Sequence, residues 1–256
     1  MTRLYRNSRC RRGAVQFACS CFVLLSILGG SLGCASSEPV FNGVDLAGWE
    51  PVVGSHTDAN SWTAAGAVVM DPAHEEKLFR IEPGEGILVN GPTGRTSNLR
   101  TVKEYGDIDL HVEFLCPRDA NSGVYLMGMY ELQIRERSHK DVPKLQMRDC
   151  GGIFARVVDG GYVDGYPPLA KAMRGPGEWQ TFDIRFRAPR FAADGAKIEN
   201  ARFEEVRLNG QVVQKDVEMR GPTGGHLPQE ESAKGPVLLQ GNHGAVAFRN
   251  LRVRER

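Results

Sequence analysis

Hydrophobic and polar residues alternate along most of the chain beyond residue 40, in short runs separated by Gly, Pro, Asn and Asp. The run from Ile108 to Leu115 alternates without a break, and those from Phe182 to Phe186 and from Val246 to Val253 resemble it. A period of two is typical of strands that bury one face. No stretch sustains a helical apolar period over three turns. The pattern therefore predicts a single all-β sandwich of roughly a dozen short strands.

The stretch from Asn121 to Arg135 is predicted to be one strand with two different faces. Its even-numbered positions from Val124 onward carry mostly apolar side chains, which indicates a core face. Its odd-numbered positions run from Tyr125 to Glu131, Gln133 and Arg135, a set that would suit the floor of a sugar-sized groove. A strand with one face in solvent explains the alternation equally well.

Three local signals refine the strand prediction. Pro117 to Ser122 resembles a hairpin loop, so we expect Ile108–Leu115 to pair antiparallel with the strand that follows. Asn209-Gly210 between two β-rich runs is the strongest hairpin signal in the sequence. Asn250 interrupts the alternation of the last strand and predicts a β-bulge. The Gly- and Pro-rich region from His139 to Gly177 is expected to form long loops over a binding face.

The first 34 residues differ in composition from the rest. Five arginines precede an apolar run from Ala14 to Leu32, and no acidic residue occurs before Glu38. This is the pattern of a secretory signal peptide, and the ending SLGCASS favours a bacterial lipoprotein site with Cys34 acylated. Plain secretion and an uncleaved anchor are the alternatives. We therefore expect a signal peptide at 1–34, a tether at 35–40, a domain at 41–256, and an exported protein anchored in the cell envelope, in the periplasm or at the cell surface.

Charge and cysteine content limit which binding partners and which disulfides are expected. Five of the 32 basic residues lie in the leader and all 31 acidic ones lie after it, so the mature chain has a formal net charge of −4. Such a chain is not expected to bind nucleic acid. Beyond Cys34 only Cys116 and Cys150 remain. They could form a disulfide after export or stay as buried thiols.

Several sequence blocks, in this order and spacing, resemble one family. They are FNGVDLAGW, YGDIDLHVEF, NSGVYLMGMYELQI, GGIF, GPGEWQTFDI, VRLNGQVV and PVLLQGNHGAVAFRNLRV. Together they span about Phe41 to Val253 and identify the chain as similar to the 3-keto-disaccharide hydrolase-like domain family. The resemblance implies a concanavalin-like jelly-roll sandwich, export, and in some members cleavage of glycosides oxidised at C3. Phe154, Lys171 and the extra residue before His243 depart from the usual motifs.

An ordinary glycosidase needs two carboxylates beside the scissile bond. The stretch Asn121–Arg135 offers Glu131 followed by Gln133, so a second carboxylate is missing. A 3-keto sugar requires less, because its carbonyl acidifies the C2 hydrogen and lets the aglycone leave by elimination before water adds. One base and one group that stabilises the enediolate are then enough.

These considerations give the candidate site. Glu131 and His243 are the catalytic candidates, one as the base and the other as the proton donor to the leaving group. The candidates for sugar contact are Asn121, Tyr125, Gln133, Lys171, Trp179 and Gln240. Tyr125 and Trp179 are proposed as stacking faces for pyranose rings, although core packing also explains Trp179.

Two other functions fit the same residues. A non-catalytic carbohydrate-binding module of the same fold is the main alternative, and a conventional endoglucanase is a weaker one. Asp109, His111 and Glu113 share a strand face and could ligate a metal if that face were concave, but a polar outer face is the simpler interpretation. No metal-ligand spacing is recognisable, so no cofactor is assigned and a divalent cation stays possible.

Overall fold

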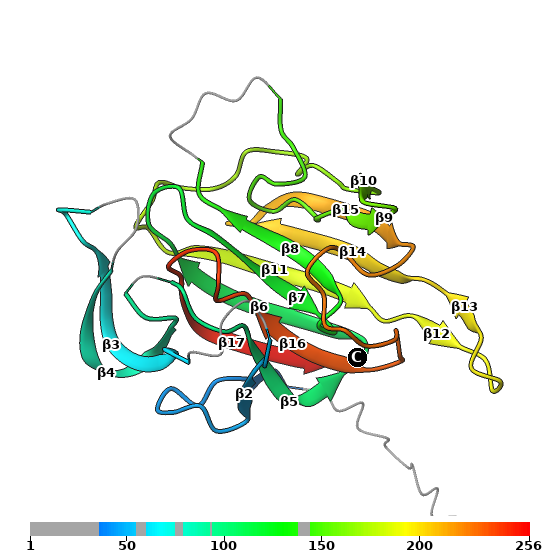
Figure 1. The fold of residues 1–256 in the computed structure, drawn as a ribbon, viewed down its shortest axis with the longest axis horizontal. Coiled ribbons are helices and arrows are strands. Elements are labelled where there is room, and N and C mark those ends of the chain that lie inside the picture. Colours follow the sequence, from blue (N-terminus) through cyan, green and yellow to red (C-terminus); the bar gives the residue numbers. More distant parts are fainter. Residues whose placement is uncertain (1–35, 55–59, 75–78, 93, 138–143) are drawn as a thin grey trace, which may run out of the picture. The chain divides into compact units, whose positions relative to one another are not determined.

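The computed structural model describes residues 36–54, 60–74, 79–92, 94–137 and 144–256. The predicted signal peptide and the predicted acylation site at Cys34 lie outside the described residues. The described part of the chain forms strands, turns and loops, without an α-helix (Figure 1). It contains no helix that is long and apolar enough to cross a membrane.

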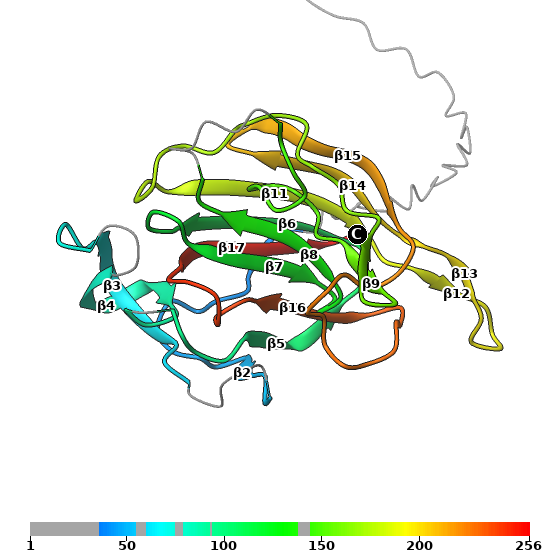
Figure 2. The ribbon, with the colours of Figure 1, turned by 45° about the horizontal axis from the view of Figure 1, so that its top comes forward.

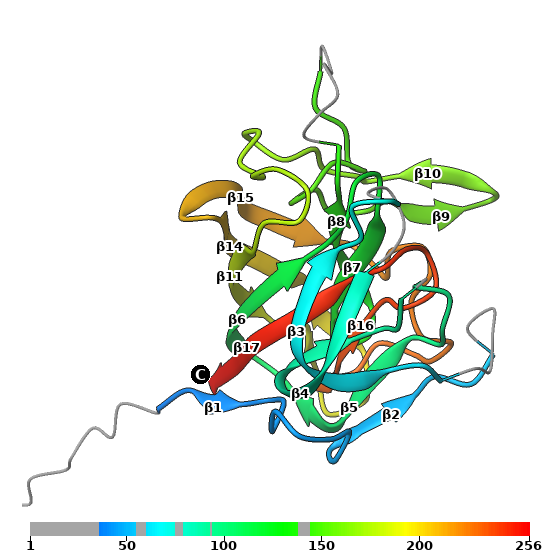
Figure 3. The ribbon, with the colours of Figure 1, turned by 90° about the vertical axis from the view of Figure 1, so that its left-hand side faces the viewer.

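Two antiparallel sheets form the sandwich, and in the side view of Figure 3 they lie as two layers. The larger sheet has the order β15 (Gln211–Met219), β14 (Ala201–Leu208), β11 (Gln180–Arg187), β6 (Ile108–Leu115), β17 (Ala247–Glu255), β4 (Phe79–Val89) and β3 (Thr63–Met70), with β1 (Glu38–Pro39) paired to β17. The smaller sheet has the order β2 (Trp49–Pro51), β5 (Leu99–Tyr105), β16 (Gly235–Leu239), β7 (Asn121–Leu126) and β8 (Tyr130–Arg135). Two short hairpins are separate: β9 (Arg156–Val158) with β10 (Gly161–Val163), and β12 (Arg190–Phe191) with β13 (Lys197–Glu199).

The core lies between the two sheets, because each contributes its alternating apolar face to one continuous cluster. Tyr130 of β8 packs on Phe186 of β11 with ring centroids 5.6 Å apart, which joins the smaller sheet to the larger. Phe186 in turn contacts Phe203 of β14 edge to face. The all-β jelly-roll sandwich predicted from the alternation and the family resemblance is confirmed.

The stretch from Asn121 to Arg135 is a hairpin rather than one strand, which corrects the prediction. Strands β7 and β8 are joined by a tight turn in which Met127 and Gly128 both have positive φ, and the Met129 amide donates to the Leu126 carbonyl. Positive φ at both central positions matches the right-handed twist of the flanking strands.

The pairing expected between Ile108–Leu115 and the next strand is also wrong. β6 pairs with β11 and β17 in the larger sheet, whereas β7 pairs with β16 and β8 in the smaller one. The segment between β6 and β7 therefore crosses from one layer to the other (Figure 1). A short polar loop allows either path, and the packing of both apolar faces into one core selects the crossover.

Two other local predictions are confirmed. Asn209 and Gly210 have φ of 52° and 82° and join β14 to β15 as a tight hairpin. The register of β17 against β6 shifts between Arg249 and Arg252, and Asn250 within that shift has φ of 51°, as expected of a bulge.

Candidate active site

The outer face of the smaller sheet carries a groove of about 400 Å³ whose polar floor comes from β7 and β8. Glu131 lies opposite Tyr125 in the antiparallel register, and Gln133 and Arg135 follow on the same face. Glu131 is only 2% exposed. Its backbone amide donates to the Thr223 hydroxyl, so the loop between β15 and β16 fixes the backbone at this position. The alternation of side chains along β8 therefore puts the Glu131 carboxyl at the base of an open groove.

Burial dominates the electrostatics of Glu131. Removal of water around the carboxyl raises its pKa from the ordinary 4.5 to about 8, while the polar side chains of Tyr125 and Gln133 beside it act in the opposite direction. The neighbouring Tyr125 has its pKa raised as well, by burial and by the nearby Glu131 carboxyl. The carboxyl of Glu131 is therefore mainly protonated at neutral pH and able to donate a proton.

Three buried polar atoms of residues that line this groove have no hydrogen-bond partner among the described residues. They are Glu131 Oε1, Arg135 Nε and Gln240 Oε1. Buried polar groups are paired in the great majority of cases, so three in one groove indicate that something else satisfies them. The set combines a carboxyl oxygen, a cationic N–H donor and an amide acceptor, which complements the hydroxyl and carbonyl groups of a sugar.

His243 also lines the groove, from the loop between β16 and β17. Its Nδ1 lies within hydrogen-bond distance of Asn242 Oδ1. Because an amide oxygen only accepts, Nδ1 carries the proton in that contact, and the lone pair of a neutral ring is then on Nε2. The arrangement allows His243 to accept a proton.

Asn90 holds this loop in place. Its buried amide nitrogen donates to the carbonyls of Gly241 and Gly244 at 3.1 and 2.8 Å, and its oxygen accepts from the Val246 amide at 2.8 Å. The loop is thus fixed on both sides of His243 by a single side chain from the end of β4.

One wall of the groove is aromatic. The segment before Phe154 runs along the free edge of β8, because the Phe154 amide donates to the Glu131 carbonyl at 3.1 Å. Phe154 meets Tyr162 of β10 edge to face at 5.5 Å, and the guanidinium of Arg148 lies 5.0 Å from the Tyr162 ring centre. Tyr162 is 56% exposed. This wall is the surface in the groove on which a flat ring can stack.

A loop between β15 and β16 closes the groove on the side of Tyr125, and Figure 2 shows it beside β9. Gly224 and Gly225 line the groove from this loop, and the Gly224 amide donates to the Ala155 carbonyl at 2.8 Å. The Tyr125 hydroxyl donates to the Gly224 carbonyl at 3.3 Å. The loop between β15 and β16 therefore borders the groove, and so does the described part of the region 139–177, which was expected to form long loops. Residues 138–143 lie outside the described residues.

Six of the eight candidate residues come together in the groove. They are Glu131, His243, Asn121, Tyr125, Gln133 and Gln240. Tyr125 is not a stacking face, because it is 1% exposed and its ring packs on Leu227 and Leu238. It presents its hydroxyl instead, to which Gln240 Nε2 donates at 3.4 Å.

Lys171 and Trp179 do not line the groove. Lys171 borders a small separate hollow on the other side of Arg135. Trp179 is half-buried against the larger sheet, where the Arg249 guanidinium lies 4.0 Å from its ring centre. Trp179 is therefore a packing residue, which was the alternative to a role in sugar stacking.

The sequence placed Arg135 on the predicted groove floor without giving it a role, and it did not single out Arg148, Phe154 or Tyr162 as site residues. Arg135 shares the odd-numbered face with Glu131, so the alternation contained a signal for it. The other three lie in irregular or short segments, where periodicity gives no orientation.

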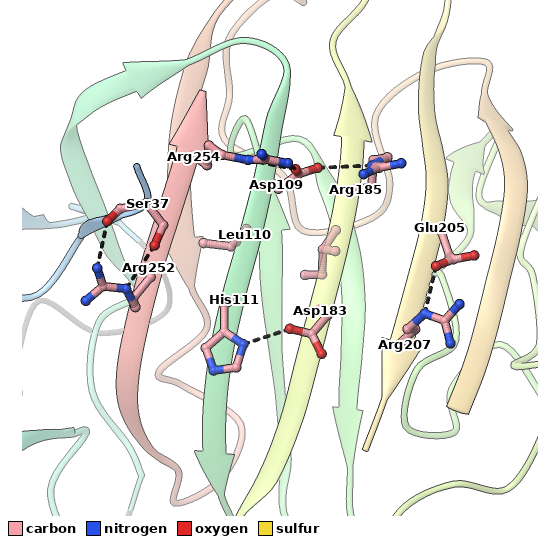
Figure 4. A pocket seen from close by; sticks show the side chains of 11 residues that line it. Ser37, Asp109, Leu110, His111, Asp183, Arg185, Glu205, Arg207, Arg252 and Arg254 are labelled. Atoms are coloured by element: carbon pink, nitrogen blue, oxygen red, sulfur yellow. Dashed lines mark hydrogen bonds and ion pairs between the residues drawn. The ribbon is translucent and has the colours of Figure 1, made fainter. Parts of the chain in front are cut away.

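The outer face of the larger sheet has a second hollow, of about 550 Å³, shown in Figure 4. Asp109 lies between Arg254 and Arg185, and His111 contacts Asp183 at 2.7 Å. Burial alone would raise the pKa of Asp109, but its arginine partners hold it below the ordinary value. These charges pair with one another, as expected of a polar outer face. Among the described residues no three His, Cys, Asp or Glu side chains gather as a metal site would require.

Cys116 and Cys150 are both free and buried. Burial raises the pKa of both thiols, that of Cys150 to about 12. Of the two alternatives considered for these cysteines, a disulfide and buried thiols, the structure shows buried thiols.

A jelly-roll sandwich with a protonatable carboxyl group in an open polar groove belongs with glycoside-acting hydrolases and lyases. Residues 36–254 match the 3-keto-alpha-glucoside-1,2-lyase-like domain, and the chain is a member of this family. The family resemblance drawn from the sequence blocks is confirmed.

Two solved structures from Parabacteroides distasonis, both of provisionally assigned glycosyl hydrolases, are similar to this chain. One is 27% identical, with 86% of this chain and 84% of the other covered and a TM-score of 0.58. The other is 16% identical, with 86% and 94% covered and a TM-score of 0.51, a likeness of fold. No curated protein sequence matches the chain.

Proposed function

We propose that the protein cleaves 3-keto-glycosides by elimination followed by hydration, with Glu131 as the acid and His243 as the base. The observation that carries the proposal is the isolation of Glu131: it is the only carboxylate among the described residues that line the groove. Hydrolysis of an unoxidised glycoside uses two carboxyl groups about 5 to 10 Å apart. A groove with one carboxyl group suits a substrate that needs no second one.

The roles follow from the two side chains. His243 Nε2 takes the C2 hydrogen as a proton, and the electrons form the enediolate with the C3 carbonyl. The bond between C1 and the aglycone oxygen then breaks, and Glu131 gives its proton to that oxygen. A pKa of about 8 keeps Glu131 protonated for this step near neutral pH. Water finally adds OH to C1 and a proton to C2, which completes a net hydrolysis.

Arg135 takes the place that the sequence had offered to Lys171. Its buried Nε is an unpartnered N–H at the groove, and a guanidinium stays charged even though burial, and next Arg137, lower its pKa. Donors aimed at developing negative charge are the usual means of stabilising an enediolate. Gln240 Oε1 is placed to accept from a sugar hydroxyl.

The test compares a 4-nitrophenyl 3-keto-glucoside with its unoxidised parent, following aglycone release with wild type, Glu131→Gln and His243→Ala. We expect release from the keto substrate alone, with a loss of about 10²- to 10⁴-fold in kcat in His243→Ala and a smaller loss in Glu131→Gln, because 4-nitrophenolate is a good leaving group. Glu205→Gln, the same exchange on the outer face of the larger sheet, is the matched control and should keep full rate. Release from both substrates would favour an endoglucanase, and sugar binding without release would favour a carbohydrate-binding module.

Two refinements test the mechanism itself. In D₂O the sugar product should carry deuterium at C2, which direct hydrolysis does not introduce. Because 4-nitrophenolate leaves without protonation, Glu131→Gln should lose less rate on the aryl substrate than on a 3-keto-disaccharide. Equal losses on both substrates would remove Glu131 from the role of acid.

We also propose export and acylation at Cys34, on the strength of the leader and the SLGCASS sequence. The full-length chain expressed in a bacterium should incorporate labelled palmitate, and Cys34→Ala should not. Secretion of an unlabelled wild-type protein would favour a plain signal peptide.

A further inference from the structure

Gly123 lies in the middle of β7, beneath the Glu131 side chain. It pairs with Gln133 in the hairpin of β7 and β8, two positions along from the Tyr125–Glu131 pair and on the same face. Its carbonyl accepts a hydrogen bond from the backbone N–H of Gln240 at 2.9 Å, which ties Gly123 to a second groove residue. Gly123 is thus buried among the groove residues while it contributes no side chain of its own.

The backbone does not explain this glycine. Gly123 is absent from the residues with positive φ, so any L-amino acid could adopt its conformation. Glycine in the interior of a strand is unfavourable, and it often marks a place where another group approaches the backbone closely.

The approaching group is the Glu131 side chain. A Cβ on residue 123 would overlap Glu131 Oε1 and would lie 3.0 Å from Cγ and 3.1 Å from Cδ. Real Cβ atoms rarely come so near, so the carboxyl would have to move. The same oxygen is the buried one without a hydrogen-bond partner.

We propose that Gly123 is a positioning residue for the reaction, because its missing side chain leaves the space in which the Glu131 carboxyl lies at the base of the groove. The role rests on the proposed function of Glu131, but the placement of the carboxyl can be measured without any substrate. An alanine at 123 should push the carboxyl outward, toward water.

The first measurement is the pKa of Glu131 by carbon NMR of protein labelled at glutamate Cδ, with Glu131→Gln used to assign the signal. In Gly123→Ala the pKa should fall toward the ordinary range of a glutamate, because the displaced carboxyl regains water. Gly161→Ala is the matched control: it is also a strand glycine without positive φ, and its Cβ would have only an ordinary contact, 3.5 Å from the Val158 carbonyl. It should leave the pKa unchanged. An unchanged pKa in Gly123→Ala would overturn the proposal, whatever the reaction is.

The second measurement is a double-mutant cycle on kcat. Gly123→Ala should lower kcat at least tenfold with a smaller effect on KM. Glu131→Asp shortens the side chain by one methylene and should relieve the overlap, so the double variant should lose much less than the product of the two single losses. A loss of kcat in the double variant equal to the product of the two single losses would overturn the proposal. If Gly123→Ala does not fold, the cycle is run on stability, where failure of Glu131→Ala to restore folding would also overturn it.

Discussion

Replacing Glu131 by Gln should slow turnover of a 3-keto-disaccharide and also change how stability depends on pH. The folded protein binds the Glu131 proton more tightly than the unfolded chain does, because burial raises its pKa from 4.5 to about 8. The contribution of this residue to stability is therefore complete below about pH 4.5, declines as the pH rises to about 8, and is constant above. Gln carries no such proton, so this decline should be missing from the variant.

The size of the effect follows from the same two pKa values. At about 1.4 kcal/mol for each pKa unit, ionising Glu131 in the folded protein costs about 5 kcal/mol in all. Between pH 5 and pH 9 the difference between wild type and variant should change by about 4 kcal/mol, as an upper value because water in the open groove relaxes the penalty. This is a large part of the stability of a typical domain.

The assay is urea unfolding of both proteins at several pH values, with free energies extrapolated to water. Any constant effect of the amide, and the titration of all other groups, cancels in the change with pH. We expect the free energy of unfolding of Glu131→Gln to rise relative to that of the wild type between pH 5 and about pH 8. Parallel pH curves for the two proteins would refute the burial argument and, with it, the acid role of Glu131.

Three further predictions concern other parts of the molecule. Arg135→Lys keeps a charge but loses the Nε donor, so kcat should fall about 10- to 100-fold with little change in KM, and equal kinetics would exclude Arg135. Tyr162→Ala should raise KM for an aryl glycoside several-fold at constant kcat. Asn209→Ala loses an αL-compatible turn residue and three side-chain hydrogen bonds, so denaturant unfolding should show a loss of about 2 to 3 kcal/mol, and Asn209→Gly a smaller one.

The groove floor was largely predictable from the sequence, even though the stretch was mistaken for one strand. The hairpin turn between β7 and β8 leaves residue numbers of equal parity facing each other, as in Tyr125 opposite Glu131. Odd-numbered residues therefore stay on one face whether the stretch is straight or folded back. The turn itself had one weak signal, Gly128, because Met127 is an unusual residue at positive φ.

The walls of the groove were not predictable in the same way. Phe154 enters the groove because its segment hydrogen-bonds along the edge of β8, and Lys171 misses it because the chain has by then passed to the other side of Arg135. Both outcomes depend on the course of irregular segments, which hydrophobic periodicity does not encode. The unpartnered state of Gln240 Oε1 likewise exists only in three dimensions.

The groove combines several features that each weaken the fold. Glu131 is buried without a charged partner, Arg135 Nε and Gln240 Oε1 are buried without hydrogen bonds, and Gly123 occupies a strand interior. Most other polar groups of the sandwich are satisfied, including the ion pairs around Asp109 on the opposite layer. Such a concentration of unfavourable choices in one groove is expected where a ligand completes the interactions. The proposed 3-keto substrate would bring hydroxyls to the two free oxygens and its C3 oxygen to the guanidinium, so binding would satisfy all three groups before the C2 proton is taken.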